Sequence, residues 1–385
     1  MALIETMTPI ERLNAAVDLK PVDRVPICPL MDFFAARQQG IPIAKYINSD
    51  QLCEEAYERT YEQMGGWDVV FSAGRLEPIL FSHAFPVRMK LPGIELAEDE
   101  VWQFDEKECM TVEEYDYIIQ HGWDKFFWGK YLPRMIPGKR AGFVGQVTTI
   151  PHLIQSEQQQ IKEIKKWAKR GRPVLMPAAI GHPFEVLSAA RSLTEFSLDQ
   201  FRRADKVIAT MEAMAPDIIA LGKRKANATR IPRIMMGAAR GSTTFISPKQ
   251  FEKFYLPILK QMVDAFAAEG ITPLLHHDSD WGKNLPYFRE LPARKFILEL
   301  DGMTDIFKAK ELLGDHVCLM GDVPATLLKL GTTEEVTAYV RKLIDVVGKG
   351  GGFILSSGCG IPIDARRENV QAMIETGRTY YPHQN

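Results

Sequence analysis

The chain has 385 residues, and its 47 Lys and Arg nearly balance its 49 Asp and Glu, for a net charge of −2. It contains no dense block of Lys and Arg, so it lacks the basic patch typical of proteins that bind nucleic acids. No apolar run approaches the roughly 18 residues that cross a bilayer, and residues 1–6 do not resemble a signal peptide. We therefore expect a cytoplasmic protein with no membrane contact. Its five cysteines form no CxxC pair, which is typical of reduced thiols.

The first predicted helix begins after Thr8. Thr8 is a suitable N-cap, Pro9 suits the first helical position, and Glu11 is placed to complete a capping box. The helix precedes the first predicted strand and forms an N-terminal helical extension of the fold.

Short apolar runs alternate with helical patterns along most of the chain. The predicted strands are residues 25–30, 69–71, 142–147, 174–178, 233–236, 271–275, 295–300, 316–320 and 352–355. Further helices are predicted at residues 50–64, 153–170, 198–223, 248–268, 306–313, 333–347 and 366–380. Strands that alternate with helices predict a parallel sheet, and a count of eight or nine strands favours a closed (β/α)₈ TIM barrel. A doubly wound sheet is less favoured, because no Gly-x-Gly-x-x-Gly follows the first strand.

Residues 74–140 interrupt this alternation. Pro, Trp and charged residues are mixed there, and the main local signal is a helix starting at Thr111 with Glu114 as its capping partner. We interpret residues 74–140 as an irregular insertion in a single domain that spans residues 1–385.

Polar side chains follow several of the later strands. His276 and Asp278 come after one strand, Glu299 lies at the end of the next, and Cys359 follows the last. The carboxyl ends of parallel barrel strands meet at the active-site mouth. Zn²⁺ accepts nitrogen, oxygen and sulfur ligands, and a catalytic zinc site has three protein ligands and one open position. The sequence therefore predicts a zinc site made of His276, Asp278 and Cys359, with Glu299 or water as the fourth ligand.

Neighbouring polar residues have structural alternatives. His277 alternates to the opposite side of its strand from His276, and Asp301 is better explained as a loop acid than as a ligand. Asp322 is equally well explained as a helix cap. Residues 31–34, Met-Asp-Phe-Phe, would suit an apolar substrate wall, although core packing explains them better.

Five motifs frame nearly the whole chain: PIER at 9–12, DRVP at 23–26, SPKQFEKFYLP at 247–257, GDVP at 321–324 and ENVQAM at 368–373. With these motifs the sequence resembles the uroporphyrinogen decarboxylase superfamily, and within it the corrinoid-dependent methyltransferases. The decarboxylases bind a polycarboxylate tetrapyrrole with an early Arg-rich segment, whereas residues 34–40 here contain one Arg, Arg37.

The resemblance also implies a site. Methyltransferases that act on coenzyme M use a His-x-Cys…Cys zinc site that maps onto His276, Asp278 and Cys359, with a Glu at the position of Glu299. Asp278 stands where a Cys is usual, and a zinc with fewer thiolates suits an oxygen better than a thiol. The implied activity is transfer of a methyl group from a methoxylated substrate, an aryl methyl ether, to the Co(I) corrinoid of a partner protein, with Asp278 and Glu299 as catalytic residues.

Other functions remain open at this level. A methylcorrinoid:thiol methyltransferase and a tetrapyrrole decarboxylase share the same framing motifs, and a non-enzymatic corrinoid- or ligand-binding module is a further alternative. The sequence leaves the oligomeric state open, with a homodimer as one alternative, because an interface and a core face have the same apolar pattern.

Overall fold

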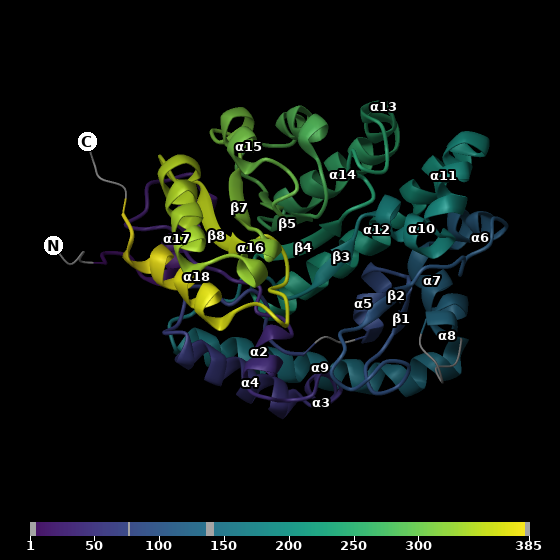
Figure 1. The fold of residues 1–385 in the computed structure, drawn as a ribbon. Coiled ribbons are helices and arrows are strands. Elements are labelled where there is room, and N and C mark those ends of the chain that lie inside the picture. The colour runs from purple at the N-terminus through teal and green to yellow at the C-terminus, as the bar shows by residue number, and fades with distance from the viewer. Residues whose placement is uncertain (1–4, 76–77, 136–141, 382–385) are drawn as a thin grey trace.

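A parallel sheet forms the centre of the molecule (Figure 1). The computed structural model describes residues 5–75, 78–135 and 142–381. Six strands lie in chain order in the sheet: β3 (Ala179–Gly181), β4 (Arg233–Ala238), β5 (Thr272–His277), β6 (Ile297–Leu300), β7 (Cys318–Val323) and β8 (Phe353–Ser357). All their pairings are parallel, as the alternation of strands and helices predicts.

Short extended segments close this sheet into a barrel. Ile27 forms a parallel bridge with Leu355 of β8, and the amide of Val69 donates a hydrogen bond to the carbonyl of Ile27. Val70 in turn forms a parallel bridge with Val174, a few residues before β3. Backbone hydrogen bonds thus run around the whole circuit, and the predicted (β/α)₈ barrel is confirmed, with single bridges at the first two strand positions.

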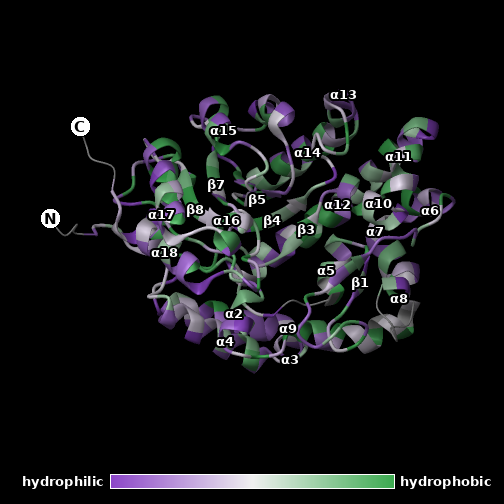
Figure 2. Ribbon diagram, viewed as in Figure 1, coloured by the Kyte–Doolittle hydropathy of each residue, from purple (hydrophilic) through white to green (hydrophobic). Residues whose placement is uncertain are grey.

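Helices surround the barrel and carry both hydrophobic and hydrophilic residues (Figure 2). They include α1 (Pro9–Val17), α2 (Phe34–Gln38), α3 (Ile43–Asn48), α4 (Asp50–Gln63), α9 (Gly142–Lys169), α10 (Pro183–Arg191), α11 (Leu193–Arg202), α12 (Ala204–Thr229), α13 (Pro248–Gln250), α14 (Leu256–Ala267), α15 (Ile306–Leu313), α16 (Ala325–Leu330), α17 (Thr333–Lys342) and α18 (Arg367–Thr379). Tighter or wider turns are η2 (Phe251–Tyr255), η3 (Gly282–Glu290) and η4 (Leu343–Val347). None of the described helices combines the length and the apolar character needed to cross a membrane.

The strand predicted at residues 142–147 is wrong. These residues form the first turns of α9, in which Val144 and Val147 are 47% and 53% exposed. The segment Gly-Phe-Val-Gly-Gln-Val is a short partly apolar run, and such a run occurs both in strands and on helix surfaces, so composition did not separate the two. Pro151, a residue that normally limits a helix, lies inside α9 and made the two halves look like separate elements.

The helix predicted at residues 198–223 is divided in the structure. α11 ends at Arg202 and α12 begins at Ala204, with Arg203 outside helical geometry between them. Sequence reasoning did not predict α10, which precedes both helices.

Residues 78–135 form ordered elements beside β3 and α10 (Figure 1). They are α5 (Pro78–Ala84), the antiparallel pair β1 (Arg88–Lys90) and β2 (Gln103–Asp105), α6 (Glu114–His121), α7 (Trp123–Phe126), η1 (Phe127–Tyr131) and α8 (Leu132–Met135). The carboxylate of Glu114 accepts a hydrogen bond from the amide of Thr111, which is one of the two bonds of the predicted capping box. The helix itself begins at Glu114, three residues later than predicted, and its N-cap Glu113 makes no capping bond.

A buried ion-pair network joins the N-terminal helix to the first two strand positions. Arg12 and Arg24 both donate hydrogen bonds to Asp68, whose side chain is fully buried, and the amide of Ile27 donates to the same carboxylate. Asp23 accepts a further bond from Arg12 at 2.7 Å. Removing one partner from such a network costs about 3–5 kcal/mol, because it leaves a buried charge uncompensated. Two of the framing motifs therefore act in closing the barrel.

Candidate metal centre

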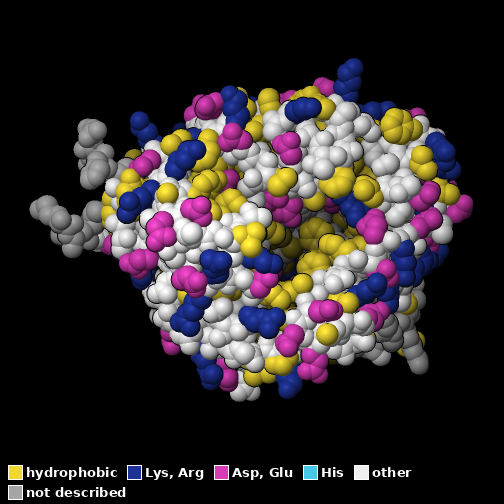
Figure 3. Space-filling view, in the orientation of Figure 1, with side chains coloured by type: hydrophobic (Ala, Val, Ile, Leu, Met, Phe, Trp, Pro, Cys, Tyr) yellow, Lys and Arg dark blue, Asp and Glu magenta, His cyan; other side chains and the backbone are white. Residues whose placement is uncertain are grey.

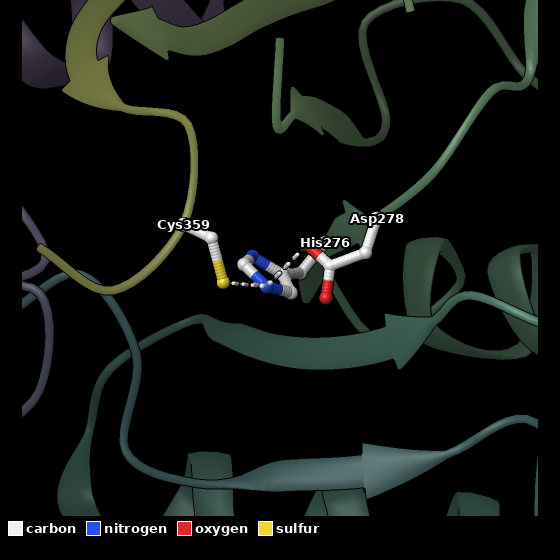
Figure 4. A group of neighbouring side chains, drawn as sticks. All are labelled: His276, Asp278 and Cys359. Atoms are coloured by element: carbon white, nitrogen blue, oxygen red, sulfur yellow. Dashed lines mark hydrogen bonds and ion pairs between the residues drawn. The ribbon is translucent and has the colours of Figure 1, made fainter. Parts of the chain in front are cut away.

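Three potential metal ligands meet at the carboxyl end of the barrel (Figure 4). His276 lies at the end of β5, Asp278 follows that strand directly, and Cys359 lies in the loop after β8. Their ligand atoms all lie within 4.8 Å of one another. His276 Nε2 is 3.5 Å from Cys359 Sγ and 3.4 Å from Asp278 Oδ1. Residues about 80 positions apart in the sequence thus form one group, as their predicted places at the carboxyl ends of barrel strands suggest.

Glu299 lies on the other side of the imidazole. It pairs with His276 in the register of β5 and β6, and its Oε2 is 2.6 Å from His276 Nδ1. The Glu299 side chain is fully buried, so this contact holds the ring with Nε2 turned toward Asp278 and Cys359. A carboxylate on the second ring nitrogen is the usual partner of a metal-binding histidine. The sequence predicts Glu299 as a fourth ligand, and in the structure its carboxylate contacts Nδ1 of His276.

The electrostatics of the group fit a cation. Burial alone would lower the pKa of His276, but the carboxylates of Glu299 and Asp278 outweigh it and hold that pKa well above its usual value. Burial raises the pKa of the Cys359 thiol and that of Glu299. Asp278 Oδ1 is shielded from solvent and has no hydrogen-bond partner among the described residues. Nitrogen, oxygen and sulfur donors that crowd together in this way match the ligand set of Zn²⁺.

His277 has different surroundings from His276. It is 1% exposed, and its ring stacks on Trp281 with 4.0 Å between the ring centroids. Burial and the neighbouring His276 and His182 keep the pKa of His277 well below its usual value. Trp281 Nε1 donates a hydrogen bond to the carbonyl of Asp278, so the Trp281 indole contacts the loop that carries one of the ligands.

Asp301 and Asp322, the other two acids that sequence reasoning weighed as ligands, accept hydrogen bonds from backbone or side-chain donors. Asp301 accepts hydrogen bonds from the amides of Ser279 and Met303, and Asp322 accepts one from the Tyr339 hydroxyl at 2.9 Å. Neither belongs to the group of three ligands.

A cavity of about 370 Å³ opens beside the three ligands. Figure 3 shows a hollow near the centre of this face, with hydrophobic side chains inside it and charged ones around its rim. One wall is aromatic and comes from α5, β2 and the residues next to them: Phe81, Phe85, Trp102 and Phe104. The rings contact one another, with centroids 5.1 Å apart for Phe81 and Phe85 and 4.8 Å for Trp102 and Phe104. Sequence reasoning missed this wall, because it lies in the part of the chain with the poorest periodicity.

Sequence reasoning considered residues 31–34 for an apolar substrate wall but gave Asp32 no role of its own. Asp32 and Met31 line the cavity, whereas Phe33 and Phe34 are buried in the core. Asp32 has a φ of +40°, which is unusual for a residue with a side chain. The Asp32 side chain is exposed to solvent, so its carboxylate is open to the cavity. A Cβ at Gly360 would lie 2.8 Å from Asp32 Oδ2, so the carboxylate packs directly against the loop that carries Cys359.

The family model for uroporphyrinogen decarboxylase (URO-D) matches residues 148–380, which is more than half of the chain. The chain belongs to the uroporphyrinogen decarboxylase family. The resemblance found in the framing motifs is thereby confirmed at the level of the family.

Among curated members of the URO-D family, the chloroplastic uroporphyrinogen decarboxylase of Zea mays is 32% identical over 139 residues, 35% of this chain and 34% of that protein. The methylcobamide:CoM methyltransferase MtbA of Methanosarcina acetivorans is 27% identical over 139 residues, 36% of this chain and 39% of that protein. The matches thus span little more than a third of these relatives. A solved methyltransferase from Methanosarcina mazei superposes with a TM-score of 0.72 at 17% identity, over 97% of this chain and 98% of that one, and shares the fold.

Proposed function

We propose that this member of the URO-D family is a zinc-dependent methyltransferase. It moves a methyl group from an aryl methyl ether to the Co(I) corrinoid of a partner protein. The observation that carries the proposal is the group of His276, Asp278 and Cys359, which faces a cavity with an aromatic wall.

The three side chains would hold the zinc, and Glu299 would orient the His276 ring through Nδ1. When bound, the metal would supply Lewis acidity toward the ether oxygen of the substrate. The protein's own residues do the positioning. Burial excludes water around His276 and Glu299, and the Trp281 indole contacts the loop that carries Asp278. One acidic and one thiolate ligand balance the charge of a divalent cation.

The cavity supports an aromatic substrate. Its volume of about 370 Å³ suits a single substituted ring, and Phe81 and Trp102 offer faces and edges for stacking. With the ring against this wall, a methoxy group would be directed toward the three ligands across the same cavity.

The cavity disfavours the decarboxylase alternative. A polycarboxylate tetrapyrrole needs several basic side chains, but Arg240 is the one Lys or Arg among the described lining residues. Its guanidinium already donates to Glu106 and Ser188. Asp32, Glu185 and Asp278 line the same cavity and would repel carboxylates.

Transfer from a methylcorrinoid to a thiol is the second candidate, and the similarity to a methylcobamide:CoM methyltransferase favours it. The same similarity supports a corrinoid protein as the partner for either direction. Asp278 favours the ether, because a zinc with a single thiolate ligand activates a bound thiol less well than one with two.

The test is methyl transfer to reduced free cobalamin from aryl methyl ethers, methylamines and methanol, followed by the spectral change of cob(I)alamin, together with the zinc content of the purified protein. We expect one zinc per chain and turnover with aryl ethers. Cys359→Ala should abolish both, whereas Cys109→Ala, a partly exposed thiol outside the site, should change neither. Retention of zinc and turnover in Cys359→Ala would refute the site, and absence of turnover with every oxygen-linked donor would refute the substrate.

A further inference from the structure

Asp32 is a solvent-exposed carboxylate that lines the cavity. Within the described part of the chain, no donor forms a hydrogen bond with its side chain, and its backbone carbonyl alone accepts one, from Tyr46. It lies outside the group of three potential ligands. It also lines an adjoining cavity of about 220 Å³, so its carboxylate faces open space on two sides. The backbone of Asp32 has a positive φ of +40°.

The other acids around the main cavity are already engaged. Glu185 accepts hydrogen bonds from the amides of Arg240 and Gly241 at 3.0 and 2.8 Å. Asp278 belongs to the metal group. Asp32 is therefore the acid that remains to meet a substrate.

No described Lys or Arg of the two cavities pairs with Asp32, and the nearby His276 is engaged by Glu299 and Asp278. The Arg240 guanidinium is committed to Glu106 and Ser188, and in the adjoining cavity Arg75 pairs with Asp50 while Lys225 pairs with Glu157. The buried Glu163 adds a further acid to that second cavity. The space around Asp32 is thus lined by aromatic and acidic groups, which suits a hydrogen-bond donor and opposes an anion.

We propose that Asp32 determines the specificity of the site for neutral aryl methyl ethers that carry a ring hydroxyl group. Its carboxylate accepts a hydrogen bond from that hydroxyl and repels a ring carboxylate. The aromatic wall then holds the ring while Asp32 sets its rotation and the methoxy group faces the metal ligands. This inference rests on the proposed function for the identity of the substrate, but it concerns binding and can be measured without turnover.

The test measures dissociation constants on zinc-loaded protein without a corrinoid partner, by calorimetry or by quenching of the tryptophan fluorescence. The probes are 2-methoxyphenol, 1,2-dimethoxybenzene, which lacks the hydroxyl, and 4-hydroxy-3-methoxybenzoate, which adds a carboxylate. A hydrogen bond to a charged group predicts that wild type binds 2-methoxyphenol about 10- to 100-fold more tightly than 1,2-dimethoxybenzene. Asp32→Ala should reduce this preference to less than about threefold, and Asp32→Asn should improve binding of the carboxylate about tenfold.

Asp364→Asn, a half-exposed carboxylate in the loop beyond Cys359, is the matched control and should keep the wild-type pattern. The comparison of the three probes on wild type needs no variant, and Asp32→Asn keeps the shape of the side chain. The test therefore still has an outcome if Asp32→Ala fails to fold. The inference is overturned if wild type binds 2-methoxyphenol and 1,2-dimethoxybenzene equally, or binds 4-hydroxy-3-methoxybenzoate most tightly. Binding of none of these three probes would also overturn it, as would tighter binding of choline, a cationic probe without a ring, than of 2-methoxyphenol. If the enzyme transfers methyl groups but shows no preference for a ring hydroxyl, this inference is overturned and the proposed function stands. If it prefers a ring hydroxyl but transfers no methyl group, the proposed function is overturned and this inference stands.

Discussion

The contact between Glu299 and His276 predicts the consequence of a single, nearly isosteric change, Glu299→Gln. In wild type the fully buried carboxylate lies 2.6 Å from Nδ1 and stabilises the ring orientation that presents Nε2 to Asp278 and Cys359. The glutamine oxygen can still accept from Nδ1, but the bond is no longer charge-assisted, and the imidazole becomes a weaker ligand.

Changes at such a supporting carboxylate reduce metal affinity about 10- to 100-fold, which corresponds to about 1.4–2.7 kcal/mol of zinc-binding free energy. The measurement is the zinc dissociation constant by competition with a chromophoric chelator, with circular dichroism to confirm folding. Glu185→Gln is the matched control, because it removes a buried cavity carboxylate that contacts backbone amides and none of the three ligands. We expect its zinc affinity to stay within about twofold of wild type.

Two results would refute this reasoning. An unchanged zinc affinity in Glu299→Gln would show that the carboxylate does not support the ligand. A complete loss of zinc, as expected for Cys359→Ala, would show that Glu299 is itself a ligand, as the resemblance to coenzyme M methyltransferases implies.

Two further predictions concern chemistry and pH. Asp278→Cys should retain zinc but lose turnover of aryl methyl ethers. It should gain methyl transfer from methylcobalamin to 2-mercaptoethanesulfonate, because a second thiolate ligand makes a zinc-bound thiol more nucleophilic. Unchanged ether turnover would contradict the role of Asp278. Burial raises the pKa of Glu163 to about 7 from an ordinary 4.5, so the folded state keeps a proton that the unfolded state releases between these values. Wild type should therefore lose stability relative to Glu163→Gln as pH rises through that window, by about 3 kcal/mol at pH 8, measured by urea unfolding; an equal difference at pH 4 and pH 8 would contradict this.

Local patterns in the sequence determined the barrel and most of its elements. The capping box of α1 is present as Thr8 and Glu11 predict, and α15 has the predicted bounds of 306–313. Alternation along β5 distinguishes His276 from His277, and the two rings have different partners, Glu299 for the first and Trp281 for the second. These features depend on residues a few positions apart, and their physical causes, capping and side-chain periodicity, act over the same short range.

The tertiary structure alone decided how the site is completed. The register of β5 on β6 brings Glu299 to Nδ1 of His276, 23 residues away along the chain. The aromatic wall comes from residues 81–104, whose role depends on the packing of α5 beside β3 and on the pairing of β1 with β2. Asp32 meets Gly360 because the barrel closes between its first and last strand positions. Pairing between distant segments is set by packing and strand register, which no local pattern records, so the sequence predicted three ligands and the fold supplied their surroundings.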